Sequence, residues 1–255
     1  RPLPAGAPDV QDILADLAAN DAAVDSFRAT GSFTLQSPEL TAIQVLPQSS
    51  ITFRAPADLY VVGRKYATTA VRLICNGPEF LIELPTEKDF YYRPHGEYRF
   101  ESVSGSVSPA DVAREMFRPE QWETLEPRAV RLLAFDSEQQ RATVEIANAA
   151  GREGLWRRIE VVGAPWVVVR SELYDAGGRQ LAITEKGEYH TMDGVRFPTY
   201  IDSAFPGESA HMKFEMRKFF VNAEIDEEDF DIAARVAELR ARGHTEREPY
   251  EGNAP

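Results

Sequence analysis

The first apolar residues of the chain recur at helical spacing. The residues that share this face are Val10, Ile13, Leu14, Leu17 and Ala18. Such a repeat is typical of an amphipathic helix with one buried side, and Asp9 is a suitable N-cap. We therefore expect a helix over residues 9–24.

From residue 27 onward, apolar positions alternate with polar ones. Alternation over residues 27–35 indicates a strand with one buried and one solvated face. The same pattern predicts further strands at residues 41–54, 58–64, 69–75, 79–84 and 89–93. Asn76 and Gly77 stand between two of these strands and favour a two-residue hairpin turn.

A second helix is predicted over residues 108–117, where the strands are interrupted. A serine and a proline begin it, and Pro119 ends or kinks it because proline disfavours the helical conformation in the residue before it. The apolar face of this helix consists of Val112, Met116 and Phe117.

The strand pattern resumes near residue 129 and continues to residue 221. In the last strand one side is apolar and the other is charged or polar, the signature of an antiparallel sheet. The apolar side consists of Ala210, Met212, Phe214 and Met216. A C-terminal helix is predicted over residues 228–242, and we expect the turn-rich tail over residues 243–255 to be mobile.

These elements amount to roughly eleven to thirteen strands in sequential hairpins. A meander of this length must curl or close to protect its edges. The predicted fold class is mainly β (α+β), with a single curled antiparallel sheet, an N-terminal helix, a mid-chain helix and a C-terminal helix. We expect a flexible leader over residues 1–8, one domain over residues 9–232, and a helix end and tail over residues 233–255.

Composition narrows the possible partners. The chain has 255 residues and a formal net charge of -13, which repels phosphate backbones, so we expect no nucleic-acid partner. Cys75 alone can form neither a disulfide nor a zinc site, and a small buried residue is the interpretation we favour.

No stretch reaches the ~18 apolar residues that a membrane-spanning helix needs. Because the chain begins with Arg1 and a proline-rich leader, we expect export, with a signal or a lipid-modified cysteine upstream.

Standard catalytic patterns are missing from the sequence. It holds no glycine-rich phosphate loop and no nucleophile elbow, and no two of its histidines stand at metal-ligand spacing. Glu79 and Glu83 share a strand without surroundings suited to a sugar. Arg170 and Glu172 follow the alternation of Trp166, where they would form a polar spot or simply an ion pair. We predict no catalytic residue, no metal site and no cofactor.

Many apolar side chains occupy one phase of their strands. They are Phe33, Leu35, Ile51, Phe53, Leu59, Val61, Phe80, Ile82, Trp166, Val168, Met212, Phe214 and Met216. Two interpretations remain open. The residues form a packed core, or the curled sheet leaves part of its concave face uncovered and an apolar cavity takes acyl chains.

The stretch over residues 171–232 resembles a known family. Its features are Tyr174-Asp175 before Gly177-Gly178, Tyr189 before the segment 193–198, and Val221-Asn222 before Asp229-Phe230. They resemble the closing half of the lipoprotein-carrier superfamily, which includes the LolA and LolB carriers and outer-membrane lipoprotein-sorting-like proteins. Residues from 9 onward are compatible with the same family.

The resemblance implies an open, incomplete β-barrel around helices, with a hydrophobic cavity for the acyl chains of a lipid or an acylated protein. The mid-chain helix would be a lid, with Met116 and Phe117 over the empty cavity. In the classical carrier an arginine directly before a strand-ending proline helps to hold the lid. Here Ala55 precedes Pro56, and Arg54 falls on the other face of the strand.

We therefore expect a monomeric lipid- or lipoprotein-binding protein, periplasmic or membrane-anchored in a bacterial cell envelope, with an envelope protein as a further partner. Apart from Val61, the residues of the apolar face, together with Phe117, are the predicted ligand contacts. The alternative is a structural or interaction lipoprotein with a filled core and no ligand.

Overall fold

The computed structural model describes residues 6–36, 40, 42–76, 79–93, 109–208 and 210–247. The helices are α1 (Val10–Ala22), α2 (Pro109–Phe117) and α3 (Ile232–Ala241). The strands are β1 (Ser26–Gln36), β2 (Gln44–Arg54), β3 (Asp58–Lys65), β4 (Thr68–Asn76), β5 (Phe80–Leu84), β6 (Asp89–Arg93), β7 (Val130–Asp136), β8 (Arg141–Ala147), β9 (Trp156–Val162), β10 (Val167–Tyr174), β11 (Gln180–Met192), β12 (Val195–Phe205), β13 (Ala210–Val221) and β14 (Thr245–Arg247). The short 3₁₀ helices include η1 (Trp122–Thr124) and η5 (Glu227–Phe230).

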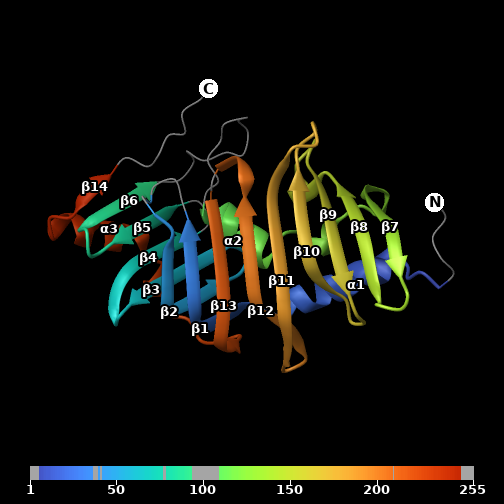
Figure 1. Cartoon of the computed structure of the whole chain (residues 1–255), viewed down its shortest axis with the longest axis horizontal. Coiled ribbons are helices and arrows are strands. Elements are labelled where there is room, and N and C mark those ends of the chain that lie inside the picture. Colours follow the sequence, from blue (N-terminus) through green and yellow to red (C-terminus); the bar gives the residue numbers. More distant parts are fainter. Residues whose placement is uncertain are drawn as a thin grey trace.

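All of these strands belong to one sheet, in the order β14-β6-β5-β4-β3-β2-β1-β13-β12-β11-β10-β9-β8-β7 (Figure 1). One meander runs from β1 to β6 and a second from β7 to β13, and the two join where β1 pairs with β13. Phe33 and Phe214 lie opposite each other in this pair, with stacked rings 4.6 Å apart between centroids. At Gly31 a Cβ would lie 2.0 Å from the carbonyl oxygen of Glu215, so only glycine lets the backbones approach this closely.

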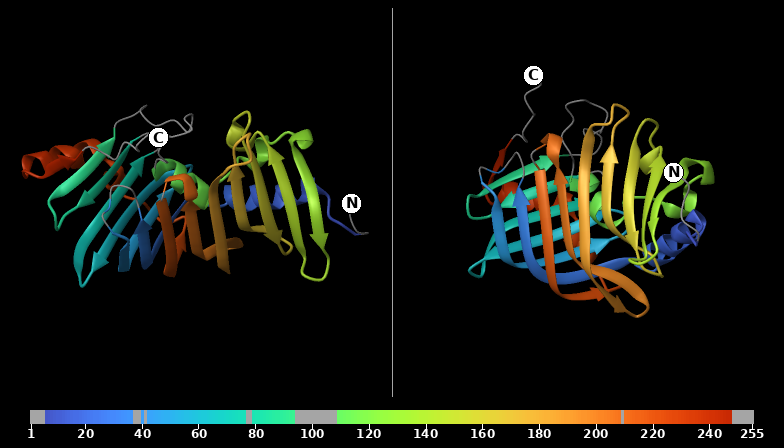
Figure 2. Two further views of the ribbon diagram at one scale, coloured as in Figure 1. Left: turned by 45° about the horizontal axis from the view of Figure 1, so that its top comes forward. Right: turned by 45° about the vertical axis from the view of Figure 1, so that its right-hand side comes forward.

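The sheet curls around α1 and α2, whereas α3 lies on the other side of the sheet (Figure 2). Alternation along β4 separates the two faces. Leu73 packs in the same cluster as Met116 of α2, and the next residue, Ile74, packs in the same cluster as Leu239 of α3. The end strands β14 and β7 do not pair with each other within the described residues. The predicted open, incomplete barrel is therefore confirmed.

Two clusters of buried side chains fill the concave face. The α2 cluster joins α2 to the strands around the β1–β13 pair. The α1 cluster joins Ile13, Leu14 and Leu17 of α1 to β7, β8, β9 and the start of β10. The predicted amphipathic helix thus buries its apolar face against the second meander.

The C-terminal segment covers the outer face of β4 and β5. Phe230, Val236 and Leu239 pack there against Ile74 and Leu81. These strands have apolar residues on both faces, as expected for strands buried on both sides.

The tail was expected to be mobile from residue 243, and the structure corrects this for its first residues. Thr245–Arg247 form β14, which pairs in parallel with β6. The backbone N–H of Thr245 donates to the carbonyl of Lys88 at 2.8 Å, which begins this pairing. The sheet therefore continues past the boundary expected at residue 232.

β4 and β5 pair antiparallel, and the N–H of Asn76 donates to the carbonyl of Glu79 at 3.2 Å. Gly77, the second residue of the predicted turn, lies outside the described residues.

Among the helices that the structure describes, none has the length and apolar character needed to cross a membrane.

Candidate ligand-binding site

The residues predicted to contact a ligand divide between the two concave-face clusters. Those in the α2 cluster are Phe33, Leu35, Ile51, Phe53, Leu59, Phe80, Ile82, Met212, Phe214 and Met216. Trp166 and Val168 belong to the α1 cluster. They lie there because this end of β10 faces α1, whose Asp16 carboxylate accepts from the N–H of Trp166 at 3.0 Å. The structure thus brings most, though not all, of the predicted set together in one cluster with α2.

The alternation predicted that Arg170 and Glu172 share the face of Trp166, but in the structure they lie on the opposite face. The register shifts between Val168 and Arg170, so the residues that follow change sides. Arg170 Nη2 lies 2.9 Å from Glu172 Oε1, and Arg170 also pairs with Glu185. The ion pair is confirmed, and it lies away from the concave face.

The last turn of α2 packs on the concave face as a plug. Met116 is fully buried. The ring of Phe117 lies among those of Phe27, Phe53 and Phe214, with centroid distances of 5.0, 4.8 and 6.2 Å. The side chain of Val112, the third predicted lid residue, lies outside the described part of the chain. Two of the three predicted lid residues therefore cover the sheet.

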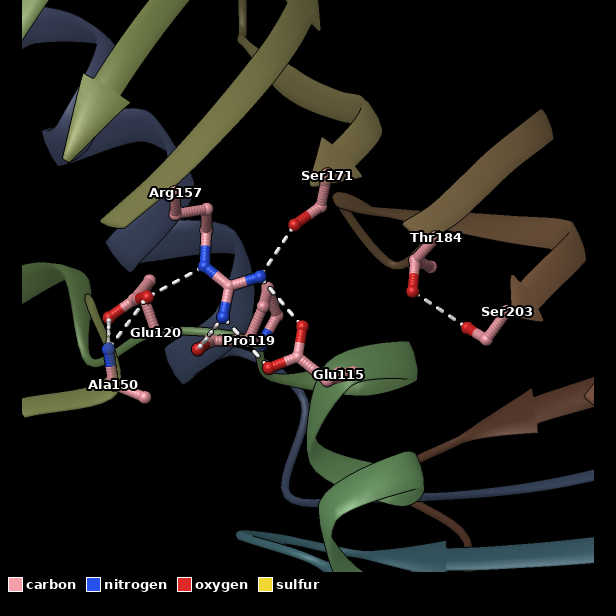
Figure 3. A network of polar contacts seen from close by, with 8 residues as sticks. All are labelled: Glu115, Pro119, Glu120, Ala150, Arg157, Ser171, Thr184 and Ser203. Atoms are coloured by element: carbon pink, nitrogen blue, oxygen red, sulfur yellow. Dashed lines mark hydrogen bonds and ion pairs between the residues drawn. The ribbon is translucent and has the colours of Figure 1, made fainter. Parts of the chain in front are cut away.

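A buried charged network ties α2 to β9 (Figure 3). The Nη1 and Nη2 atoms of Arg157 donate to the two carboxylate oxygens of Glu115 at 2.7 and 2.8 Å. Its Nε donates to Glu120 at 2.7 Å, and its Nη1 also donates to Ser171 Oγ at 2.7 Å. Burial alone would lower the pKa of Arg157, but Glu115 and Glu120 outweigh it and raise that pKa. The guanidinium therefore stays charged, and its fork is filled by acceptors on three segments.

The segment after α2 is fixed to the end of α1. The guanidinium of Arg118 donates to the carbonyl oxygens of Asp21 and Val24. The indole Nε1 of Trp122, in η1, donates to Asp21 Oδ2 at 2.7 Å. Burial raises the pKa of Asp21, although this indole, Lys186 and Arg118 oppose the shift. Polar contacts therefore hold α2 between β9 on one side and α1 on the other.

A cavity of about 50 Å³ remains where α2, the end of α1 and strands β11 and β12 meet. Four of the predicted contact and lid residues line it: Phe53, Met116, Phe117 and Val168. The other apolar side chains of its lining are Leu17, Val24, Phe27, Pro119, Trp122, Val167, Phe197, Pro198 and Ile201. Pockets for small ligands usually measure about 300–1,000 Å³. With α2 packed on the concave face, the cavity is therefore smaller than such a pocket.

One lysine faces this cavity. Lys186 on β11 lies directly opposite Ile201 on β12, and opposed residues of an antiparallel pair share a face of the sheet. Two residues earlier, Thr184 faces the same side and its hydroxyl lies 2.7 Å from Ser203 Oγ (Figure 3). Burial lowers the pKa of Lys186 to about 8, against the attraction of Asp21 and Glu115. The ammonium is thus a desolvated cation in a mostly apolar lining.

A larger groove adjoins the cavity on the side of η1. Its volume is about 830 Å³, and it shares Asp21, Arg118, Pro119 and Trp122 with the cavity. Its remaining lining is mainly polar or charged. Apolar cavity and polar groove meet at this shared wall, which is an arrangement suited to an amphiphile.

The sequence prediction missed the charged residues of this site. Arg157 had a detectable signal, because it alternates with Ile159 and Val161, which places an arginine on an apolar face. Lys186 had none of this kind, because it stands between Glu185 and Gly187 in a polar stretch. Only the register with β12 places its side chain inside.

Arg54 lies on the outer face, as its shifted position predicted. Its guanidinium pairs with Asp58 at 2.7 Å and with Glu227 of η5 at 2.5 Å, and it stacks over the ring of Phe230. Ala55 instead packs against the α2 cluster. Arg157 and Arg118, rather than an arginine at this strand end, therefore hold the mid-chain helix.

No family model and no curated protein matches this sequence. Solved structures do match over most of both chains. A LolA superfamily protein from Nitrosomonas europaea is 14% identical, with a TM-score of 0.54, and the match covers 89% of this chain and 100% of that one. The chain has a LolA-like fold. A domain from Vibrio parahaemolyticus, assigned to outer membrane lipoprotein sorting, is 12% identical with a TM-score of 0.52, covering 88% and 97%. A DUF1329 family protein from Desulfovibrio piger is 12% identical with a TM-score of 0.55, covering 88% and 96%. At such low sequence identities, the similarity to these proteins concerns the fold alone.

Proposed function

We propose that this protein binds the acyl chain of a lipid or of an acylated protein beneath α2, as a non-catalytic carrier of the bacterial cell envelope. The observation that carries the proposal is the position of Met116 and Phe117. They lie on an apolar concave face beside a residual cavity, where an acyl chain would lie once α2 moved. The LolA-like fold and the lipoprotein-sorting assignment of the similar Vibrio domain support the same function.

Binding in this scheme exchanges α2 contacts for ligand contacts. Each methylene removed from water contributes about 0.8 kcal/mol, so a chain of about ten buried methylenes contributes roughly 8 kcal/mol. Exposing Phe117 costs about 2–3 kcal/mol by the same measure. Separating Glu115 from Arg157 adds about 3–5 kcal/mol. An opening that lifts Phe117 but keeps the ion pair is therefore the less costly one, and longer chains should bind more tightly.

The groove beside η1 offers the route of entry. It shares a wall with the cavity at Arg118 and Trp122, so an amphiphile could enter the cavity from there. Such a carrier would be exported and periplasmic or membrane-anchored, and the groove would leave the protein part of an acylated ligand outside the barrel.

The proposal is tested by extraction and by titration. Protein purified from an envelope fraction is extracted into organic solvent and analysed for lipid by mass spectrometry. Purified protein is also titrated with Nile red, a neutral fluorescent probe, and then with fatty acids of increasing chain length. We expect released lipid, or displacement of the probe at lower concentrations as the chain lengthens. If no lipid is released and no fatty acid displaces the probe, the proposal is wrong.

One observation favours a second candidate, a structural or interaction protein with a filled core. The cavity of about 50 Å³ is small, and two apolar side chains of the segment at the start of β2, Ile43 and Val45, are 57% and 58% exposed. In that case the exposed side chains would contact an envelope partner. A protein that binds no chain in the titration, but loses a partner when Ile43 and Val45 become serine, would have this function.

A further inference from the structure

The wall of the cavity is positively charged although the whole chain is strongly acidic. Its formally charged residues are Asp21, Arg118, Lys186 and Arg196, in a protein whose net charge is -13. Three of the four are cations. Since the overall charge repels anions, a local excess of cations around an apolar cavity requires its own explanation.

The two arginines are already bound to main-chain oxygens. Arg118 donates to the carbonyls at the end of α1, and Arg196 Nη1 donates to the carbonyl of Pro165 at 2.7 Å. These carbonyls satisfy hydrogen bonds without cancelling the charge. The field of both guanidinium groups therefore adds to that of Lys186 within the cavity.

Within the described part of the chain, no hydrogen bond or ion pair joins the ammonium of Lys186 to another residue. The carboxylates that attract it are already engaged. Asp21 accepts from the indole of Trp122, and Glu115 is held by both Nη atoms of Arg157. An ammonium in an apolar lining without a hydrogen-bonded acceptor is costly, and an anionic group entering the cavity would supply that acceptor.

We infer that Lys186 is the recognition point for an anionic headgroup, a carboxylate or a phosphate, on the amphiphile that this cavity takes. The inference rests on the proposed function, because it names which chains the site prefers. The headgroup would accept a charge-assisted hydrogen bond from the ammonium, while the chain lies along the apolar side of the lining toward Phe53 and Phe117. A neutral ester or alcohol of the same chain would leave the ammonium without this bond.

The experiment compares charged and neutral partners of equal chain length. Palmitate and methyl palmitate are each used to displace Nile red from the full-length protein, and phosphatidic acid and diacylglycerol form a second pair. For wild type we expect the anionic member of at least one pair to displace the probe at about tenfold lower concentration, as one charge-assisted hydrogen bond implies. The pair that shows the preference identifies the headgroup.

Three variants separate recognition from chain binding. Lys186→Met keeps the length of the side chain and should bind the members of each pair equally, while Lys186→Arg should retain the preference. Lys213→Met is the matched control, because Lys213 pairs with the exposed Glu215 on the outer side of β13. If wild type shows no preference, or if Lys186→Met keeps it, the inference is overturned and chain binding stands. If no compound displaces the probe, the proposed function fails and the inference fails with it.

Discussion

Arg157 on β9 and Glu115 on α2 form a bidentate ion pair, with N–O distances of 2.7 and 2.8 Å. The pair is fully enclosed, because Arg157 is 0% exposed and Glu115 4%. It joins the mid-chain helix α2 to β9 of the second meander. In the lipoprotein carriers that the sequence resembles, an arginine at a strand end helps to hold the lid. Here the strand-end arginine is turned outward, and a different strand supplies the cation.

The first prediction concerns this pair. Glu115→Gln keeps the shape of the side chain but removes the charge that offsets the burial of Arg157. Breaking a buried pair on one side typically costs about 3–5 kcal/mol, and because Glu120 still accepts from Arg157 we expect the lower end, about 3 kcal/mol. Equilibrium unfolding in urea measures the loss of free energy of unfolding.

The control for this prediction is Glu145→Gln. Glu145 also pairs with an arginine across neighbouring strands, but its partner Arg131 is 71% exposed. Exposed pairs contribute about 0–1 kcal/mol. Equal losses in the two variants would contradict the view that the enclosed pair anchors α2.

Much of the sheet could be predicted from alternation, and the reason is physical. In β13 the apolar and polar residues change places at each step, because one face is buried and the other is wet. The position of the C-terminal helix against the sheet could not be predicted from alternation. The apolar residues on both faces of β4 and β5 indicate burial on both sides, but they do not say which segment covers them.

The candidate site was predictable only in its apolar part. Phe53 and Phe117 follow the periodicity of a strand and a helix, so their face was visible in the sequence. Trp166 was assigned to the same surface because alternation gives a face but not a position along the sheet. Lys186 depends on the register between β11 and β12, which is a long-range property that no local pattern encodes.

The second prediction concerns the plug of the cavity. Phe117→Ala removes a ring that packs among Phe27, Phe53 and Phe214. Core Phe→Ala changes cost about 3–5 kcal/mol, and because Phe117 is only half-buried we expect about 3 kcal/mol in urea unfolding. The variant should also take up Nile red more tightly than wild type, since the cavity is enlarged.

A matched control exists for this change. Phe220 is 62% exposed, and Phe220→Ala should alter neither the free energy of unfolding, beyond about 0.5 kcal/mol, nor the affinity for the probe. A Phe117→Ala variant that loses stability without binding the probe more tightly would favour the filled-core function.

The third prediction concerns the outer face. Leu239 of α3 is fully buried against the side of β4 and β5 that turns away from the cavity. Leu239→Ala should lower the free energy of unfolding by about 2–4 kcal/mol and leave the affinity for Nile red unchanged. Ala241→Ser, at the exposed end of the same helix, serves as the control. A change in affinity for the probe would show that α3 and the cavity are coupled.

The last prediction follows from the protonation of Lys186. Its pKa is lowered by burial from 10.5 to about 8 in the folded protein. Between these two values the unfolded chain holds a proton that the folded chain has released, so the contribution of Lys186 to the free energy of unfolding rises with pH across this window and is lower below it. The charged groups that act on the ammonium are Asp21, Glu115 and Arg157.

Lys186→Met removes that proton from both states. At neutral pH it should therefore raise the free energy of unfolding by about 1–3 kcal/mol, a range discounted because the side chain is only half-buried. The gain over wild type should shrink as pH rises from 8 to 10.5, the two pKa values of this group, and urea unfolding at several pH values measures it. A residue kept for structure alone would destabilise the protein when removed. A variant that is more stable than wild type at neutral pH, yet no longer distinguishes palmitate from its methyl ester, is the result expected if the protein retains an unfavourable, partly desolvated charge for the sake of its ligand.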